Sequence, residues 1–224
     1  MVDLEGQARE FAAEVTDLLN RTVTDGIRLK SVIANRRATT VHVGYGISSK
    51  DLTAKPVPLG IRRTPPACHL LVAYILGLDP EQAHLAVAKS QYGLYLDSDR
   101  QKMLVHWDYT REPENDYPAA HVQVNGDCEH FDTLTEKARS AGRASPMRPL
   151  RDFHFPVGGR RFRPTLEDVI EFLVVEGLAE KRDGFEVAVA EHRVRWEERQ
   201  LRAAVRRFPD IALAQLREDR HIQV

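Results

Sequence analysis

The chain has 224 residues, 42% hydrophobic and 29% charged, which is ordinary for a globular protein that can bury a core. Its formal net charge of −1 excludes a strong overall attraction to nucleic acid or to membrane surfaces. The two cysteines, Cys68 and Cys128, form no CxxC pair, and their separation argues against a disulfide scaffold. Without a membrane-length apolar run or a signal-peptide pattern, we expect a cytoplasmic protein with no membrane attachment.

An amphipathic helix is predicted at the start of the chain, ending near Asn20. Asp3 can cap it, and its apolar residues recur at steps of three and four, as in a helix that packs on a sheet. These residues are Leu4, Ala8, Phe11, Val15, Leu18 and Leu19. Strands are predicted over 27–33 and 39–47, and a short strand over 59–62 inside a proline-rich loop.

The middle of the chain carries the strongest strand pattern. Residues 68–78 are almost wholly apolar, as in a central strand buried on both faces. Residues 83–96 form one long strand whose apolar parity changes near Lys89 and Ser90, which indicates a β-bulge. Two further strands over 102–109 and 118–124 complete an antiparallel meander.

The C-terminal third is predicted to be helical after an irregular stretch over 127–163, in which a helix can begin near Phe131. Thr165 and Asp168 form an approximate capping box for a helix that ends at Gly177. A longer helix is expected from about residue 188 to 207, followed by a short one that Asp210 can cap. The predicted inner face of the long helix consists of Val194, Leu201, Val205 and Phe208.

These elements predict an α+β fold. An N-terminal helix packs on a curved antiparallel sheet of roughly five to seven strands, and a helical C-terminal region follows. Three parts are expected: a helix-plus-sheet domain over 1–135, a basic connector rich in proline and glycine over 136–164, and the helical region over 165–224. The last part can pack against the first as one domain.

The strands over 102–109 and 118–124 bring titratable side chains together. Alternation places His106 and Asp108 on one face of the first strand and His121 and Gln123 on the same face of the second. A hairpin centred near residues 113 and 114 would seat His106 directly opposite His121. Gly93, beside His106 on the preceding strand, would leave space above the pair for a small ligand or a phosphate.

Two imidazoles at this spacing suit general acid–base chemistry near neutral pH. The sequence therefore predicts a nucleic-acid-acting, ribonuclease-like enzyme with His106, His121 and Asp108 as its catalytic residues. RNA or another phosphate-bearing ligand would be held by basic side chains of the connector. The candidates for this role are Arg148, Arg151, His154, Arg160 and Arg161.

Three other interpretations remain open at this point. His106, Asp108 and His121 could bind a metal, with Cys128 or His130 added, but no ligand spacing is diagnostic, so no metal or cofactor is predicted. The polar face could instead be the solvent-exposed side of the sheet, or the histidines could be structural residues whose hydrogen bonds are satisfied. A non-catalytic binding or assembly module is the alternative function, with a protein partner at the C-terminal helices or the basic connector.

Overall fold

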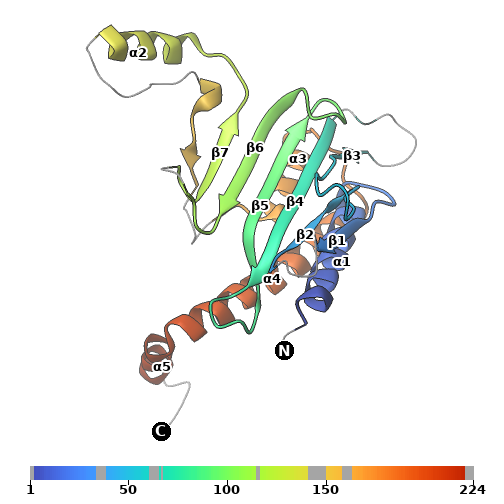
Figure 1. Ribbon diagram of the computed structural model, residues 1–224, viewed down its shortest axis with the longest axis vertical. Coiled ribbons are helices and arrows are strands. Elements are labelled where there is room, and N and C mark those ends of the chain that lie inside the picture. The colour runs from blue at the N-terminus through green and yellow to red at the C-terminus, as the bar shows by residue number, and fades with distance from the viewer. Residues whose placement is uncertain are drawn as a thin grey trace.

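One eight-stranded antiparallel sheet and the helices on one of its faces organise the protein (Figure 1). The computed structural model describes residues 3–33, 39–60, 66, 68–114, 117–140, 150–157 and 163–219. The strands are β1 (Leu29–Ile33), β2 (Val41–Tyr45), β3 (Val57–Leu59), β4 (Cys68–Leu78), β5 (Leu85–Tyr95), β6 (Met103–Thr110), β7 (Ala120–Val124) and β8 (Phe155–Pro156). The helices are α1 (Leu4–Thr22), α2 (Glu129–Ser140), α3 (Leu166–Val175), α4 (Phe185–Arg207) and α5 (Pro209–Glu218), with a 3₁₀ turn at Leu150–Asp152.

The strand order confirms the predicted α+β meander. The sheet runs β1-β2-β4-β5-β6-β7-β8, and β3 pairs with β4 beside that path. The sheet has one strand more than the upper limit of the prediction, because β8, a piece of two residues, was not predicted. The short strand lies at Val57–Leu59 rather than 59–62, and residues 61 and 62 are outside the described part of the chain. No helix in the described ranges is long and apolar enough to cross a membrane.

Strands β4 and β5 form the centre of the sheet. β4 spans the predicted 68–78, and Leu70, Leu71 and Leu76 on it are fully buried. In β5, Lys89 pairs with Ile75 and Val87 pairs with Leu76, so Ala88 is the extra residue of a bulge. The bulge therefore lies one residue before the predicted position, and it reverses which side chains of β5 face the core.

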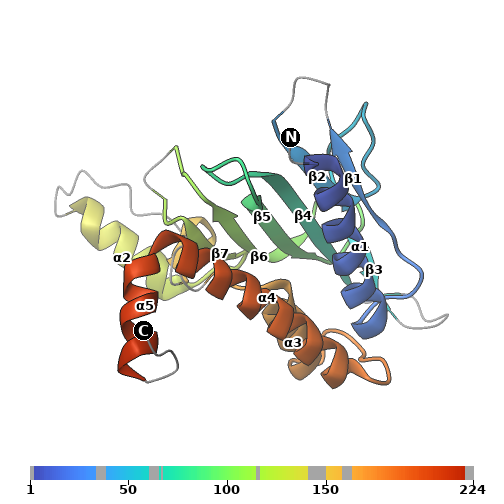
Figure 2. The same cartoon turned by 90° about the horizontal axis from the view of Figure 1, so that it is seen from below.

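The helices cover one face of the sheet. Figure 2 shows α3 and α4 beneath the strands and α1 against the β1–β2 end. One core cluster joins Leu19 of α1, Val72 of β4 and Ile170 of α3, so these helices and the sheet share the same apolar interior. The predicted caps hold: the Asp3 carboxylate accepts from the Gly6 amide at 2.8 Å, and Thr165 and Asp168 form a complete capping box.

The predicted inner face of α4 is wrong. α4 starts at Phe185, and its buried residues are Phe185, Ala188, Val189 and His192, all in its first half. Beyond His192 the helix extends away from the sheet. The apolar residues of its second half are therefore left largely uncovered by the described part of the chain. The side chains expected inside are 43–65% exposed: Val194, Leu201, Val205 and Phe208.

The last helix also begins differently from the prediction. Phe208 occupies the N-cap position without a side-chain bond, and Pro209 is the first helical residue. Proline suits this position because its missing N–H would have no partner there. Asp210 therefore lies in the first turn of α5 and does not cap it.

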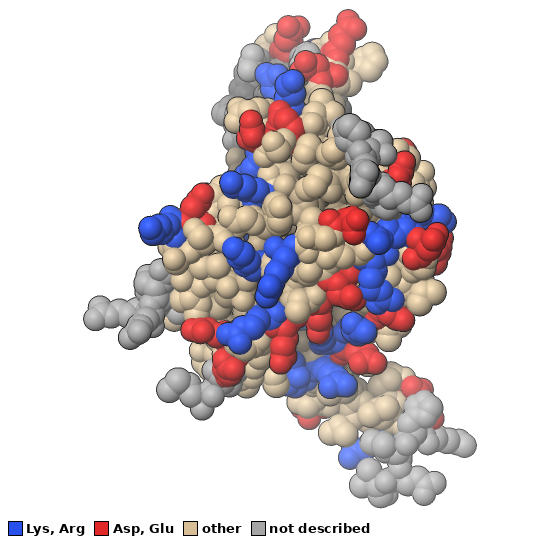
Figure 3. All heavy atoms as spheres, turned by 90° about the vertical axis from the view of Figure 1, so that its right-hand side faces the viewer, with Lys and Arg blue, Asp and Glu red and all other residues tan. Residues whose placement is uncertain are grey.

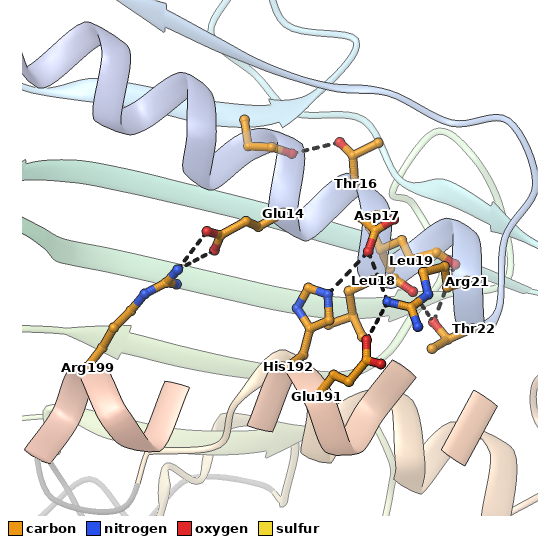
Figure 4. A network of polar contacts seen from close by, with 11 residues as sticks. Glu14, Thr16, Asp17, Leu18, Leu19, Arg21, Thr22, Glu191, His192 and Arg199 are labelled. Carbon is orange, nitrogen blue, oxygen red and sulfur yellow. Dashed lines mark hydrogen bonds and ion pairs between the residues drawn. The ribbon is translucent and has the colours of Figure 1, made fainter. Parts of the chain in front are cut away.

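Ion pairs on the surface connect α4 to α1 (Figure 4). Arg199 contacts both carboxylate oxygens of Glu14 at 2.6 Å. Nearer the start of α4, Arg21 bonds to Glu191 at 2.8 Å and to Asp17 at 3.3 Å. Because these groups are partly exposed, we assign them orientation of the helices rather than a large share of the stability.

Candidate functional site

The β6–β7 hairpin presents three titratable side chains on the sheet face opposite the helices. Its register pairs Asp108 with His121 and His106 with Gln123. The prediction that His106 stands directly opposite His121 is therefore wrong by two residues. A shift of two preserves the face of every side chain, so the predicted group remains together. The two imidazoles are diagonal neighbours, with ring centroids 6.5 Å apart.

The Asp108 carboxylate lies between the two histidines. Its Oδ2 is 3.3 Å from Nε2 of His106 and 3.9 Å from Nε2 of His121. Its Oδ1 is buried and has no hydrogen-bond partner within the described residues. The cluster therefore contains an acceptor oxygen whose bonding capacity the described chain leaves unused.

The contacts of His121 assign its protonated nitrogen. Nδ1 lies 3.0 Å from the carbonyl oxygen of Pro118, which can only accept, so Nδ1 carries a proton. In the neutral ring Nε2 then has a free lone pair. At 3.9 Å from Asp108 this atom is beyond hydrogen-bond distance of the carboxylate. The ring is therefore held by one nitrogen and offers the other as a proton acceptor.

The contacts of His106 differ from those of His121, because both of its ring nitrogens have a neighbour that can accept a hydrogen bond. Nε2 lies 2.6 Å from Oε1 of Gln123, and Nδ1 lies 2.9 Å from Sδ of Met103. Nε2 of Gln123 donates to the carbonyl oxygen of Arg151 at 3.5 Å, which turns Oε1 toward His106. Both ring nitrogens thus face acceptors, an arrangement that suits a ring protonated on both nitrogens.

Met103 reaches this face through an irregularity that the sequence analysis missed. Leu94 pairs with Val105 and Tyr95 with Met103, so Leu104 is an extra residue in β6. The extra residue moves Met103 to the face of His106. The available signal was the run of three apolar residues over 103–105, which breaks strict alternation.

Part of the predicted basic connector lies against the cluster. β8 pairs with β7, placing Pro156 beside His121. The His154 ring meets the His121 ring at 4.6 Å between centroids and stacks on Tyr117 at 3.8 Å. Tyr117 was not predicted as a site residue, because it precedes the strand in a polar loop. The His106–Asp108–His121 cluster is thus flanked by the stacked rings of Tyr117 and His154.

These neighbours leave the catalytic candidates largely covered. The side chains of His106 and His121 are only 12% exposed, and that of Asp108 is 27% exposed. A fully solvated sheet face would leave them open, so that interpretation does not fit the structure. The space expected above Gly93 is also absent: a Cβ there would lie 2.7 Å from the Tyr95 ring, which occupies it.

Two of the predicted phosphate-binding residues, Arg151 and His154, are described, and both lie beside the hairpin: the Arg151 carbonyl accepts from Gln123, and the His154 ring contacts His121. Arg151 lies in the 3₁₀ turn beside β7, is about half exposed, and pairs with Asp127 at 3.4 Å. Arg163 lies 4.3 Å above the ring of Tyr109, a residue buried on the helix side of the sheet. Arg148, Arg160 and Arg161 are outside the described residues. Figure 3 shows that the α1 side of the molecule intersperses acidic and basic side chains, without one large basic area.

The cluster also contains atoms that can bind a metal. One ligand atom each from His106, Asp108 and His121 lie within 4.8 Å of one another. Cys128 and His130 do not join this group within the described part of the chain. Nitrogen and carboxylate donors in this number suit zinc and neighbouring transition metals.

Comparison of the chain with protein-family models, with curated proteins and with solved structures finds no match. We therefore infer the function from the geometry of the His106–Asp108–His121 cluster.

Proposed function

We propose that the protein is a metal-independent ribonuclease, with His121 as the general base and His106 as the general acid. The observation that carries the proposal is the complementary hydrogen bonding of the two rings. Nε2 of His121 is left with a lone pair, whereas Nε2 of His106 faces only acceptors. A base and an acid of this kind are what in-line cleavage of an RNA phosphodiester requires.

In the proposed reaction, Nε2 of His121 takes the proton of a ribose 2′-hydroxyl, and the 2′-oxygen forms a bond to phosphorus. The bond between phosphorus and the 5′-oxygen breaks, and Nε2 of His106 gives its proton to that oxygen. The products are a 2′,3′-cyclic phosphate and a 5′-hydroxyl. No water or metal is consumed, and the two histidines end in exchanged protonation states.

The surrounding residues would position this pair. Pro118 fixes the His121 ring through Nδ1, and Gln123 and Asp108 orient Nε2 of His106. A base next to the scissile phosphate could stack on Tyr117 or His154, since aromatic rings bind unpaired bases without sequence preference. Arg151, about half exposed beside β7, would leave its ion pair with Asp127 to meet the phosphate.

The test is cleavage of single-stranded RNA by the purified chain in a buffer with excess chelator. We expect products with 2′,3′-cyclic ends and no cleavage of the same sequence with 2′-deoxyribose. His106→Ala and His121→Ala should each lower the rate about 10²–10⁴-fold. His84→Ala, an exposed histidine before β5, is the matched control and should retain the wild-type rate. A folded double variant that cleaves like wild type, or a wild type that cleaves no RNA, would overturn the proposal.

A second candidate function, assembly through the C-terminal helices, is favoured by the exposure of α4 and α5. Helix α5 has no buried residue, and a 10-residue helix without tertiary packing is marginal in water. Apolar side chains at least 41% exposed continue along both helices: Val194, Leu201, Val205, Phe208, Ile211, Leu213 and Leu216.

A second copy of the chain is the partner that fits this surface. Arg202, Arg206 and Arg207 make the end of α4 basic, whereas α5 carries Asp210 and Glu218 against the single Arg217. Antiparallel pairing of two copies would set these opposite charges against each other. Light scattering should then give twice the 25.4 kDa chain mass, and a Leu201→Ser/Ile211→Ser variant should give the single-chain mass. A monomeric wild type would contradict this function.

A further inference from the structure

We infer that the His106–Asp108–His121 cluster binds one divalent transition-metal ion of the zinc class. The ligand atoms would be Nε2 of His106, Oδ2 of Asp108 and Nε2 of His121. They come from two adjacent strands of a sheet, so their spacing is set by the β6–β7 register rather than by a mobile loop.

The distances between these atoms are close to those of a tetrahedral site. Oδ2 of Asp108 is 3.3 Å and 3.9 Å from the two imidazole nitrogens, and all three atoms lie within 4.8 Å of one another. Zinc bonds of about 2.1 Å separate neighbouring ligand atoms by about 3.4 Å. The 3.3 Å pair already has this spacing, whereas the 3.9 Å pair and the two imidazole nitrogens, which lie within 4.8 Å of each other, would have to move closer together to complete the geometry.

The hydrogen bond from His121 supports the same inference. Metal-bound histidines commonly donate their second ring nitrogen to a backbone carbonyl, which fixes the ring and its free lone pair. Nδ1 of His121 makes this bond to Pro118 at 3.0 Å, and Nε2 points to the cluster without a hydrogen bond from the described residues. His121 is therefore oriented as a ligand before any ion arrives.

The carboxylate provides a second, independent indication. Oδ1 of Asp108 is buried without a hydrogen-bond partner in the described chain, so the anionic group is only partly satisfied. A bound cation would neutralise this carboxylate, whose buried Oδ1 has no partner in the described chain although the side chain as a whole is 27% exposed. Gln123 would have to release Nε2 of His106, and its amide oxygen, now 2.6 Å from that nitrogen, would face the ion.

The donor set selects the metal. Two imidazoles and one carboxylate suit Zn²⁺, Co²⁺ and Ni²⁺, whereas Mg²⁺ and Ca²⁺ prefer oxygen ligands. Binding would occupy the lone pair on Nε2 of His121 and displace the proton on Nε2 of His106. The ion is therefore expected to inhibit RNA cleavage, a consequence that depends on the proposed function, while ion binding itself does not.

The test is titration of chelator-stripped protein with Co²⁺, followed by visible absorption, and with Zn²⁺, followed by calorimetry. We expect one ion per chain and the intense visible bands of a low-coordinate cobalt site. His121→Ala and Asp108→Asn should each weaken binding at least 10-fold, whereas His84→Ala and His130→Ala should leave it unchanged. Circular dichroism of each variant shows whether its fold is retained. If His121→Ala does not fold, Asp108→Asn still tests the site, because asparagine keeps the shape of the aspartate side chain.

The outcomes separate the two proposals. Absence of Co²⁺ and Zn²⁺ binding by the wild type, or equal binding by a folded His106→Ala/His121→Ala variant, overturns the metal site whatever the protein does to RNA. Binding without RNA cleavage supports the metal site and removes the ribonuclease. An increase of RNA cleavage on adding Zn²⁺ overturns the inferred inhibition.

Discussion

His121 lies directly opposite Asp108 across the β6–β7 pair, with Nε2 and Oδ2 3.9 Å apart. This relationship places a carboxylate, rather than a second imidazole, against the free nitrogen of His121. It makes the cluster a shared site of three groups and gives it two uses, proton transfer and cation binding.

Asp108→Asn should separate the two uses of the cluster. The amide keeps the shape of the side chain but loses the charge, so the electrostatic contact with Nε2 of His106 at 3.3 Å is weakened. RNA cleavage in chelator should fall about 10-fold, and the remaining activity should no longer respond to Zn²⁺. Initial rates with and without Zn²⁺ measure both effects. Asp183→Asn, at an exposed position before α4, is the control and should change neither. An unaltered Zn²⁺ response of Asp108→Asn would contradict the prediction.

The same substitution on two helices should test which apolar side chains form the core. Leu173 on α3 is fully buried, whereas Leu201 on α4 is 65% exposed. Leu173→Ala should lower the free energy of unfolding by about 2–5 kcal/mol because it leaves a cavity in the interior. Leu201→Ala should change it by less than about 0.5 kcal/mol in the monomer. Urea unfolding at low protein concentration compares the two, and a large effect at Leu201 would place that side chain in a packed interface.

Thr165→Ala should expose the contribution of the capping box to α3. The Thr165 hydroxyl accepts from the Asp168 amide at 3.2 Å, and the Asp168 carboxylate accepts from the Thr165 amide at 2.9 Å. Loss of the hydroxyl should lower the free energy of unfolding by about 1 kcal/mol. Thr133→Ala, an exposed position within α2, is the control and should not destabilise, since alanine is the better helix former. Equal unfolding midpoints for both variants would contradict a role for this cap.

Alkaline pH should destabilise the protein through a buried tyrosine pair. The hydroxyl oxygens of Tyr74 and Tyr92 lie 3.1 Å apart in the core, and burial raises the pKa of Tyr92 to about 12. The unfolded chain releases this proton near pH 10, so above that pH the unfolded state binds fewer protons and stability falls. The contribution is present below pH 10 and is lost as the pH rises to about 12, at roughly 1.4 kcal/mol per pH unit.

Urea unfolding at pH 9 to 12 measures this loss. Tyr92→Phe removes the ionisable group, so its stability should decline less steeply over the same range. Tyr45→Phe, on β2 outside the pair, should follow the wild-type slope. A wild-type slope retained by Tyr92→Phe would exclude Tyr92 as the cause.

Local patterns in the sequence were sufficient for the main elements of the fold. The periodicity of α1, the apolar run of β4 and the Thr165 box each depend on contacts within a few residues, and all three appear as predicted. The group on the hairpin face was also predictable. Alternation assigns His106, Asp108, His121 and Gln123 to one face for any register that keeps the apolar residues inside.

Only the tertiary structure decided the register within that group. Shifting β7 by two residues leaves every side chain on the same face, so the hydrophobic pattern could not distinguish His106 from Asp108 as the partner of His121. The His154 ring beside His121 was likewise inaccessible, because it depends on packing between distant segments, whereas the Tyr95 ring over Gly93 comes from the same face of the same strand. The same limit explains α4: its sequence determined an apolar stripe, but a stripe is buried only where another part of the chain is close enough to cover it.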